Sequence, residues 1–242
     1  MATITGSSTI DWSGISLGQV NIETDIAKFA TRVDQIVTEL VNFQVTPVFV
    51  SSTTFVGDLS TGARLTLTGS GFGDVLNSFT FKDPPDGTGE VIRFTGILDG
   101  IGKDVLTSAT IGSTGLSETI KGNITISPNW PLDSANYKGT LTSLVAKIGS
   151  TTATFSGNFS LTGDLVNASL AGMVNAISVG SGANTIKMTG LLVDVDVIEA
   201  ALASSQLATV NDLFSFVGNQ LNSNDTITYT NNIPGTGMTF FG

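Results

Sequence analysis

The chain has 242 residues, of which 40% are hydrophobic but only 12% charged, and its formal net charge is −10. It contains no cysteine and no histidine. This excludes a disulfide framework, a thiolate nucleophile, Ser-His and Cys-His catalytic pairs, and the commonest zinc ligands. Ten basic residues against 20 acidic ones also argue against nucleic acid as a partner, because phosphates require clustered Lys and Arg.

The first part of the chain divides into a polar arm and a helix. Residues 1–22 are rich in Gly and Ser, with Ile10 and Trp12 in one short alternating piece that could form a strand or a loose tail. Residues 25–43 place apolar side chains at helical spacing opposite charged ones, which predicts an amphipathic helix. Thr24 is the residue we expect to cap it.

From residue 48 to residue 193 the hydrophobic period changes to two, which is typical of strands. Turn-forming Gly and Pro residues separate the predicted strands. These strands lie at 48–56, 63–69, 76–82, 90–98, 104–111, 117–126, 137–148, 152–162, 164–179 and 185–193.

A short theme recurs within the strands: an apolar or aromatic residue, one polar residue, then Gly. It appears as LTG, FTG, IKG, YKG, FSG, LTG and MTG, and the glycines are Gly69, Gly96, Gly122, Gly139, Gly157, Gly163 and Gly190. Their spacing is irregular, whereas a solenoid repeats each turn at a fixed length. Glycine inside a strand pattern indicates a bulge, a bend or the close approach of another backbone.

After the strands, residues 196–222 return to helical spacing, with Ser204 and Ser205 as the expected break and Thr209 as a cap. Residues 225–242 form a tail in which a short strand is predicted around Ile227 and Tyr229. The chain is therefore expected to consist of an N-terminal arm (1–22), one β-rich domain (23–224) and a C-terminal strand or tail (225–242).

These elements predict a mainly β fold of the α+β class. The expected form is a large irregular β-sandwich or barrel-like sheet flanked by amphipathic helices, with a parallel β-helix as the alternative. No run of apolar residues is long enough to predict a membrane span.

One turn offers a candidate metal site. Asp83, Asp86 and Glu90 belong to the sequence DPPDGTGE (83–90) and lie around its turn, and oxygen-rich turns of this kind can hold calcium. The alternative is that Asp and Gly simply form the turn. Farther along, Asp194, Asp196 and Glu199 could hold a metal, although acidic residues are also favoured at a helix N-terminus.

The opening MATITGSSTID, the absence of Cys and His, the acidity and the strands rich in Gly, Thr, Ser and Asn together resemble bacterial proteins exported by type I secretion. These include RTX-like adhesins and surface-layer or matrix proteins. The resemblance implies export without an N-terminal leader and calcium binding outside the cell. The chain departs from the RTX pattern because it has no array of Gly- and Asp-rich nonapeptides.

The missing catalytic side chains predict a non-enzymatic, extracellular structural protein. We expect it to be a subunit of a filament, surface layer or biofilm matrix that assembles with itself by strand addition through a terminal segment. The candidate anchors for self-assembly are Ile10, Trp12, Ile227, Tyr229, Phe240 and Phe241. The alternative is a secreted adhesive module that binds a glycan or calcium.

Overall fold

The fold comes from a computed structural model. It describes residues 2–8, 22–42, 45–71, 75–86, 88–98, 104–113, 115–126, 136–164, 166–204, 207–218 and 226–231. The chain divides into two compact units. Unit 1 comprises residues 1–22, 142–159 and 171–242, and unit 2 comprises residues 23–141 and 160–170.

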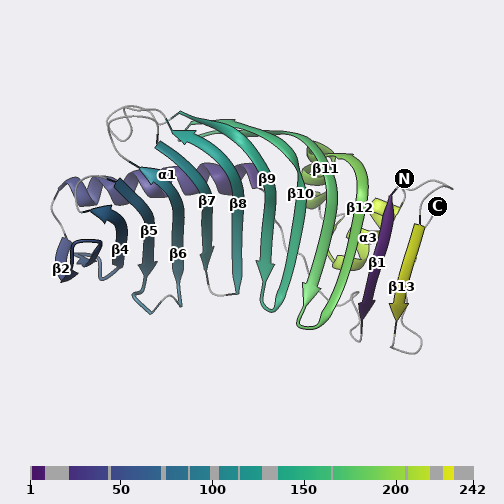
Figure 1. The fold of residues 1–242 in the computed structure, drawn as a ribbon, viewed down its shortest axis with the longest axis horizontal. Coiled ribbons are helices and arrows are strands. Elements are labelled where there is room, and N and C mark those ends of the chain that lie inside the picture. The colour runs from purple at the N-terminus through teal and green to yellow at the C-terminus, as the bar shows by residue number, and fades with distance from the viewer. Residues whose placement is uncertain are drawn as a thin grey trace. The chain divides into compact units, whose positions relative to one another are not determined.

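The described residues form thirteen strands that lie in one hydrogen-bonded order, β13-β1-β12-β11-β10-β9-β8-β7-β6-β5-β4-β3-β2 (Figure 1). The consecutive strands from β2 to β8 pair antiparallel, as do β11 and β12. β1 pairs antiparallel with β12, and β13 pairs in parallel with β1. The bounds are β1 Thr3–Ser8, β2 Val45–Val50, β3 Thr54–Leu59, β4 Arg64–Gly71, β5 Val75–Asp83, β6 Glu90–Leu98, β7 Asp104–Ser113, β8 Leu116–Ile126, β9 Tyr137–Ile148, β10 Thr151–Gly163, β11 Ala168–Ser181, β12 Asn184–Asp194 and β13 Thr226–Asn231.

The mainly β class with flanking helices is confirmed, and the arrangement is one open sheet. Among the described residues there is no second sheet packed on the first and no closed barrel, and the antiparallel pairing excludes the parallel β-helix. The physical reason is that amphipathic helices bury the apolar face of the strands, so no second sheet is needed to do so.

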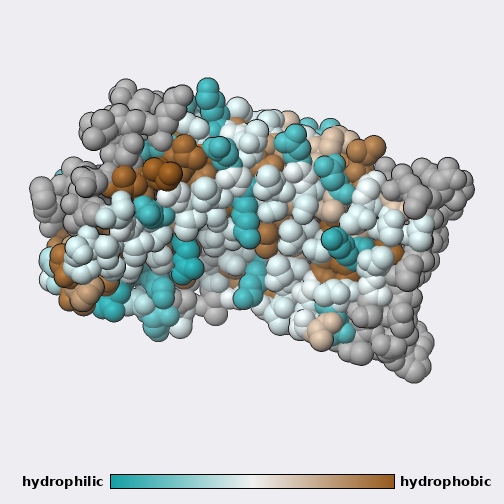
Figure 2. Space-filling view, viewed as in Figure 1, coloured by the Kyte–Doolittle hydropathy of each residue, from teal (hydrophilic) through white to brown (hydrophobic). Residues whose placement is uncertain are grey.

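In unit 2 the helix α1 (Ile22–Val41) lies across one face of the sheet (Figure 1). Its apolar stripe includes the buried Ile26, Val33 and Ile36 and packs on the side of the sheet that carries Phe94. The ring of Phe94 stacks on that of Phe79, with 4.5 Å between the centroids. We call the side of the strands that faces α1 the covered face and the opposite side the open face. Figure 2 views the open face, where residues of near-neutral hydropathy dominate and strongly hydrophilic residues stand singly.

The helix α1 begins three residues earlier than predicted, so Thr24 lies inside its first turn and the predicted cap is wrong. The first turn carries Glu23 and Asp25, which favour a helix N-terminus there because of the macrodipole. Glu23 also fixes this end of the helix, because its Oε1 accepts a hydrogen bond of 2.6 Å from the backbone N–H of Leu170.

In unit 1 the predicted helical segment 196–222 forms two helices, α2 (Val195–Ala203) and α3 (Val210–Gly218). The break follows Ser204, as expected. Thr209 caps α3, since its Oγ1 accepts from the N–H of Asp212 at 3.2 Å while Asp212 accepts in return from the N–H of Thr209 at 2.9 Å. Together the two helices bury Ile198, Leu213 and Phe214. Among the described residues, no helix has the length and apolar character needed to cross a membrane.

The recurring glycine theme is explained by the close approach of neighbouring strands. A Cβ atom added to Gly96 would collide with the carbonyl oxygen of Val105, and one added to Gly122 with that of Thr140. The sheet shifts register at several of these points, for example between Thr95 and Gly96. Backbone collisions of the same kind apply at Gly69, Gly139 and Gly157. The prediction that these glycines mark bulges or close approach is confirmed.

Candidate functional site

The first open edge of the sheet is β2, which pairs with β3 on one side and has no other partner strand in the part of the chain that the structure describes. Val48, Phe49 and Val50 are 53%, 54% and 59% exposed. Such a run of exposed apolar residues on an edge strand is a template for pairing with another chain. The register of β2 shifts between Pro47 and Phe49, and a proline and a bulge are the only protective devices in this strand, because its sequence VTPVFV has no charge.

The second open edge is β13, whose sequence TITYTN is also uncharged. It pairs with β1 in the same chain, with Ile227 opposite Ile4 and Tyr229 opposite Gly6. Its other side has no partner strand among the described residues. Of the predicted anchors, Ile227 and Tyr229 therefore lie at this edge, whereas Ile10, Trp12, Phe240 and Phe241 lie outside the described residues.

Two of the three residues of the predicted calcium site have separate partners, Glu90 with Arg32 and Asp86 with Thr88. Asp83 ends β5 and lies opposite Glu90 in the register of β5 and β6. Asp86 Oδ1 accepts hydrogen bonds from the backbone N–H and the hydroxyl of Thr88 at 2.9 and 2.8 Å, and these hold the pKa of Asp86 below its usual value. Within the described ranges, no group of three or more acidic side chains has the arrangement of a metal site. Calcium binding therefore stays a prediction.

Acidic residues near residue 194 lie at the N-terminus of α2. Asp194 is the N-cap of α2, and its Oδ1 accepts from the N–H of Asp196 at 3.1 Å. The interpretation of these residues as favourable acids at a helix N-terminus is confirmed.

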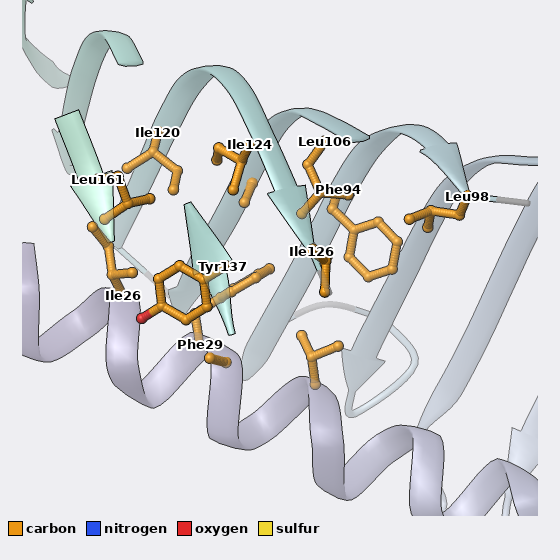
Figure 3. A pocket seen from close by; sticks show the side chains of 13 residues that line it. Ile26, Phe29, Phe94, Leu98, Leu106, Ile120, Ile124, Ile126, Tyr137 and Leu161 are labelled. Carbon is orange, nitrogen blue, oxygen red and sulfur yellow. The ribbon is translucent and has the colours of Figure 1, made fainter. Parts of the chain in front are cut away.

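A small apolar cavity of about 50 Å³ lies between α1 and the covered face (Figure 3). It is lined by Phe29, Phe94, Ile120, Tyr137 and Leu161, among others. The hydroxyl of Tyr137 donates to the carbonyl of Asn167 at 3.4 Å. Burial, with a smaller contribution from the charge of Asp164, raises the pKa of Tyr137 to about 12. A cavity of this size holds at most a few small molecules such as water, so it is a packing feature rather than a substrate site.

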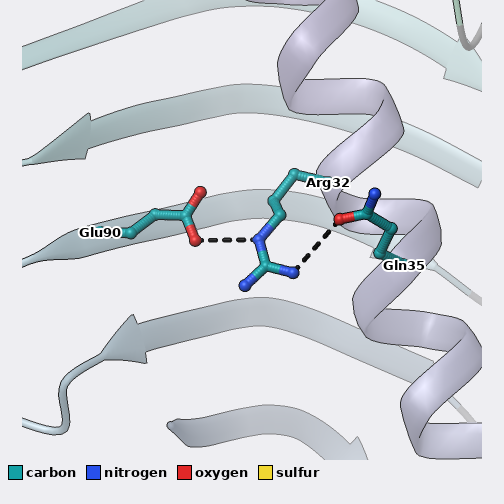
Figure 4. Close-up of polar contacts among 3 residues, drawn as sticks. All are labelled: Arg32, Gln35 and Glu90. Carbon is teal, nitrogen blue, oxygen red and sulfur yellow. Dashed lines mark hydrogen bonds and ion pairs between the residues drawn. The ribbon is translucent and has the colours of Figure 1, made fainter. Parts of the chain in front are cut away.

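Polar contacts fix one flank of α1 to the sheet (Figure 4). Arg32 Nε donates to Glu90 Oε2 at 2.9 Å, and its Nη1 donates to Gln35 Oε1 at 3.3 Å. The guanidinium also lies 5.0 Å from the ring centroid of Phe81. These side chains border a wide groove of about 590 Å³ beside the helix, but their donors and acceptors are used in holding the helix.

An acidic pair lies farther along the same flank. Burial and the neighbouring carboxylate of Asp25 raise the pKa of Glu118 to about 8. The ammonium of Lys28, which forms a 2.9 Å ion pair with Asp25, acts in the opposite direction. Glu118 is therefore mostly protonated at neutral pH and donates a hydrogen bond to Asp25 rather than repelling it.

Comparisons with protein-family models, with curated proteins and with solved structures found no match.

The edge strand β2 was not predicted as a separate element. Residues 48–56 were predicted as one strand, whereas β2 ends at Val50 and β3 begins at Thr54. The signal for the break is Ser51, whose Oγ accepts from the N–H groups of Thr53 and Thr54 at 3.3 and 3.0 Å. Consecutive serines and threonines at 51–54 are common in such turns and could have indicated it.

Proposed function

We propose that this protein is an extracellular structural protein that assembles with itself by strand addition, as a subunit of a filament, surface layer or matrix. The observation that supports this most directly is the open sheet with two uncharged edge strands, β2 and β13. Unpaired backbone N–H and C=O groups on such edges gain hydrogen bonds when another strand adds to them.

The two edges differ in sequence and position in the strand order, so pairing of β2 in one copy with β13 in the next is a head-to-tail contact. Contacts of this kind do not close on themselves and generate fibres unless a rotation closes a ring. In this scheme the exposed Val48, Phe49 and Val50 become covered by the incoming strand. The role needs no reactive side chain, which accords with the absence of Cys and His. The extracellular location rests on the compositional resemblance to exported bacterial proteins.

The first test places charge on the β2 edge. In the double variant Val48→Lys and Val50→Lys, two ammonium groups would have to be desolvated in the contact. We expect fibres or large oligomers of the wild-type chain, seen by electron microscopy and sedimentation velocity, to be lost. The matched control is Leu192→Lys, on a β12 side chain that is 79% exposed; it should assemble normally. Unchanged assembly of the β2 double variant would refute the proposal.

A second measurement identifies the partner edge. Because the chain has no cysteine, Phe49→Cys and Thr228→Cys each introduce a single thiol. Mixing the two variants and adding a short bifunctional maleimide should give a cross-linked dimer that contains one of each. Cross-linking of Phe49→Cys with itself as the main product would instead indicate a two-fold β2–β2 contact.

A further inference from the structure

The open face of unit 2 carries rows of hydroxyl groups. Strand register places Thr66, Thr80, Arg93, Thr110 and Thr119 in one row across β4 to β8. A second row runs through Thr68, Ser78, Thr95, Ser108 and Lys121. Neighbouring hydroxyls hydrogen-bond within the rows, with 2.6 Å between Thr68 and Ser78 and 2.8 Å between Thr110 and Thr119.

Charge is sorted between the two faces. Alternation and register along the strands place five basic side chains on the open face. Four of them follow or precede a buried residue of the covered face, and Lys121 lies opposite Ser108 of the second row. The five residues are Arg64, Lys82, Arg93, Lys121 and Lys138, half of the ten Lys and Arg residues of the chain.

The acidic residues of the same strands lie on the other side. Asp83, Glu90, Asp104 and Glu118 share the parity of the buried residues, and Glu90 contacts Arg32 of α1 directly. The one acidic side chain on the open face in β3 to β8 is Asp58, which Arg64 neutralises through two hydrogen bonds of 2.7 and 3.0 Å. A chain of net charge −10 thus presents a positively charged sheet face.

We propose that the open face of unit 2 binds an acidic polysaccharide, an extended chain of sugars that carries carboxylate or sulfate groups. Lys82, Arg93 and Lys138 would neutralise the anionic groups, and the Thr and Ser hydroxyls would exchange hydrogen bonds with the sugar hydroxyls. Arg93 and Lys138 are exposed, and Arg93 lies one residue from Ile92, which is fully buried on the covered face. This inference concerns the face and not the edges of the sheet, and it does not depend on self-assembly.

The chemistry of the face favours this partner over nucleic acid. The phenylalanines of β5 and β6, Phe79, Phe81 and Phe94, all lie on the covered face. Among the described residues of β4 to β8, the open face therefore lacks the aromatic platforms on which bases stack. Phe49 of the edge strand β2 lies at the end of the Thr66 row, opposite Val56. The basic side chains of the open face are also few, and Arg64, which lies directly opposite Lys82, is neutralised by Asp58. That pattern suits a polyanion of low charge density better than the dense phosphates of nucleic acid, which the overall negative charge would repel.

The test uses monomeric full-length protein and three probes: polygalacturonate, neutral dextran and duplex DNA. We expect binding to polygalacturonate that weakens as NaCl is raised, and no binding to dextran. The variant Lys82→Gln, Arg93→Gln and Lys138→Gln should lower the affinity for polygalacturonate on the order of tenfold at low salt.

A control variant carries the same change in net charge on the outer side of α1: Lys28→Gln, Thr31→Glu and Gln35→Glu. It should leave the affinity within about twofold of wild type, because these side chains lie away from the open face. Circular dichroism of both variants verifies that each is folded.

Several outcomes would overturn the proposal. Equal losses in the two variants would show that net charge alone attracts the polymer. An affinity for dextran equal to that for polygalacturonate would show that the charge of the polymer does not drive binding. Tighter binding to DNA would identify nucleic acid as the partner. Salt-sensitive self-association that the open-face variant abolishes, without binding to polygalacturonate, would mean that the face contacts a second copy of the chain.

Discussion

The two faces of the sheet in unit 2 are built from alternate residues of the same strands, yet they differ in almost every property. The covered face holds Phe79, Phe81, Ile92 and Phe94 against α1, and all but one of the acidic residues of β3 to β8 lie on that side. The open face holds Thr, Ser, Lys and Arg. The difference shows that a strand period of two can sort charge as well as hydrophobicity.

The largest expected effect contrasts neighbouring positions on the two faces. Phe94 is 4% exposed and stacks on Phe79, so Phe94→Ala should destabilise the protein by about 3–5 kcal/mol through lost burial and an enlarged cavity. Thr80→Ala on the open face should cost less than about 1 kcal/mol. Urea unfolding followed by circular dichroism measures both. Similar losses for the two variants would show that the open face is also packed against something.

A pH-dependent effect tests the acidic pair on the covered face. The pKa of Glu118 is about 8 in the fold and about 4.5 in the unfolded chain, because burial and Asp25 disfavour its ionised form. The folded state therefore binds the Glu118 proton more tightly. The stability that this proton supplies is complete below about pH 4.5 and is lost as the pH rises through about 8.

We expect the Tm of the wild-type protein to fall by about 5 °C more than that of Glu118→Gln between pH 6 and pH 9, since Gln mimics the protonated acid. Differential scanning calorimetry of the two proteins isolates the contribution of Glu118 from that of other titrating groups. Parallel pH profiles would mean that Glu118 ionises freely and does not lie buried beside Asp25.

The smallest effect concerns the ion pair between α1 and β6. The side chains of Arg32 and Glu90 are 26% and 33% exposed, so solvent screens their attraction. A double-mutant cycle with Arg32→Met and Glu90→Gln should give a coupling of about 0.5–1 kcal/mol. The control pair is Lys28 and Asp25, whose side chains are 64% and 22% exposed. Because the ammonium of Lys28 lies mostly in solvent, the coupling should be smaller, about 0.3 kcal/mol. A larger coupling free energy at the control pair would show that the solvent exposure of the side chains does not determine which ion pair is stronger.

Local patterns were enough to predict most elements of the fold. The strands from β4 to β10 and β12 begin and end within about two residues of their predicted bounds, because alternating apolar residues and turn glycines are properties of adjacent positions. The capping of α3 by Thr209 and of α2 by Asp194 is local as well. β1 was missed because TITGSS has little apolar content, and it becomes a strand through pairing with β12 and β13.

The candidate sites show the limit of reading residues that are close in sequence. Asp83, Asp86 and Glu90 lie within eight residues, and their proximity suggested shared ligation. Strand alternation and the placement of α1 instead direct Glu90 to Arg32, 58 positions away, while Asp86 folds back on its own turn. Partners so distant in the sequence leave no local signal.

The sequence by itself determined the β class, the amphipathic helices, the turns and the positions of bulge glycines, because each follows from the preferences of neighbouring residues. Only the tertiary structure decided that the sheet stays open, that β2 and β13 form its edges, and that acids and bases lie on opposite faces. Those properties depend on which strands pair and on which face the helix covers. Both are settled by contacts between residues far apart along the chain.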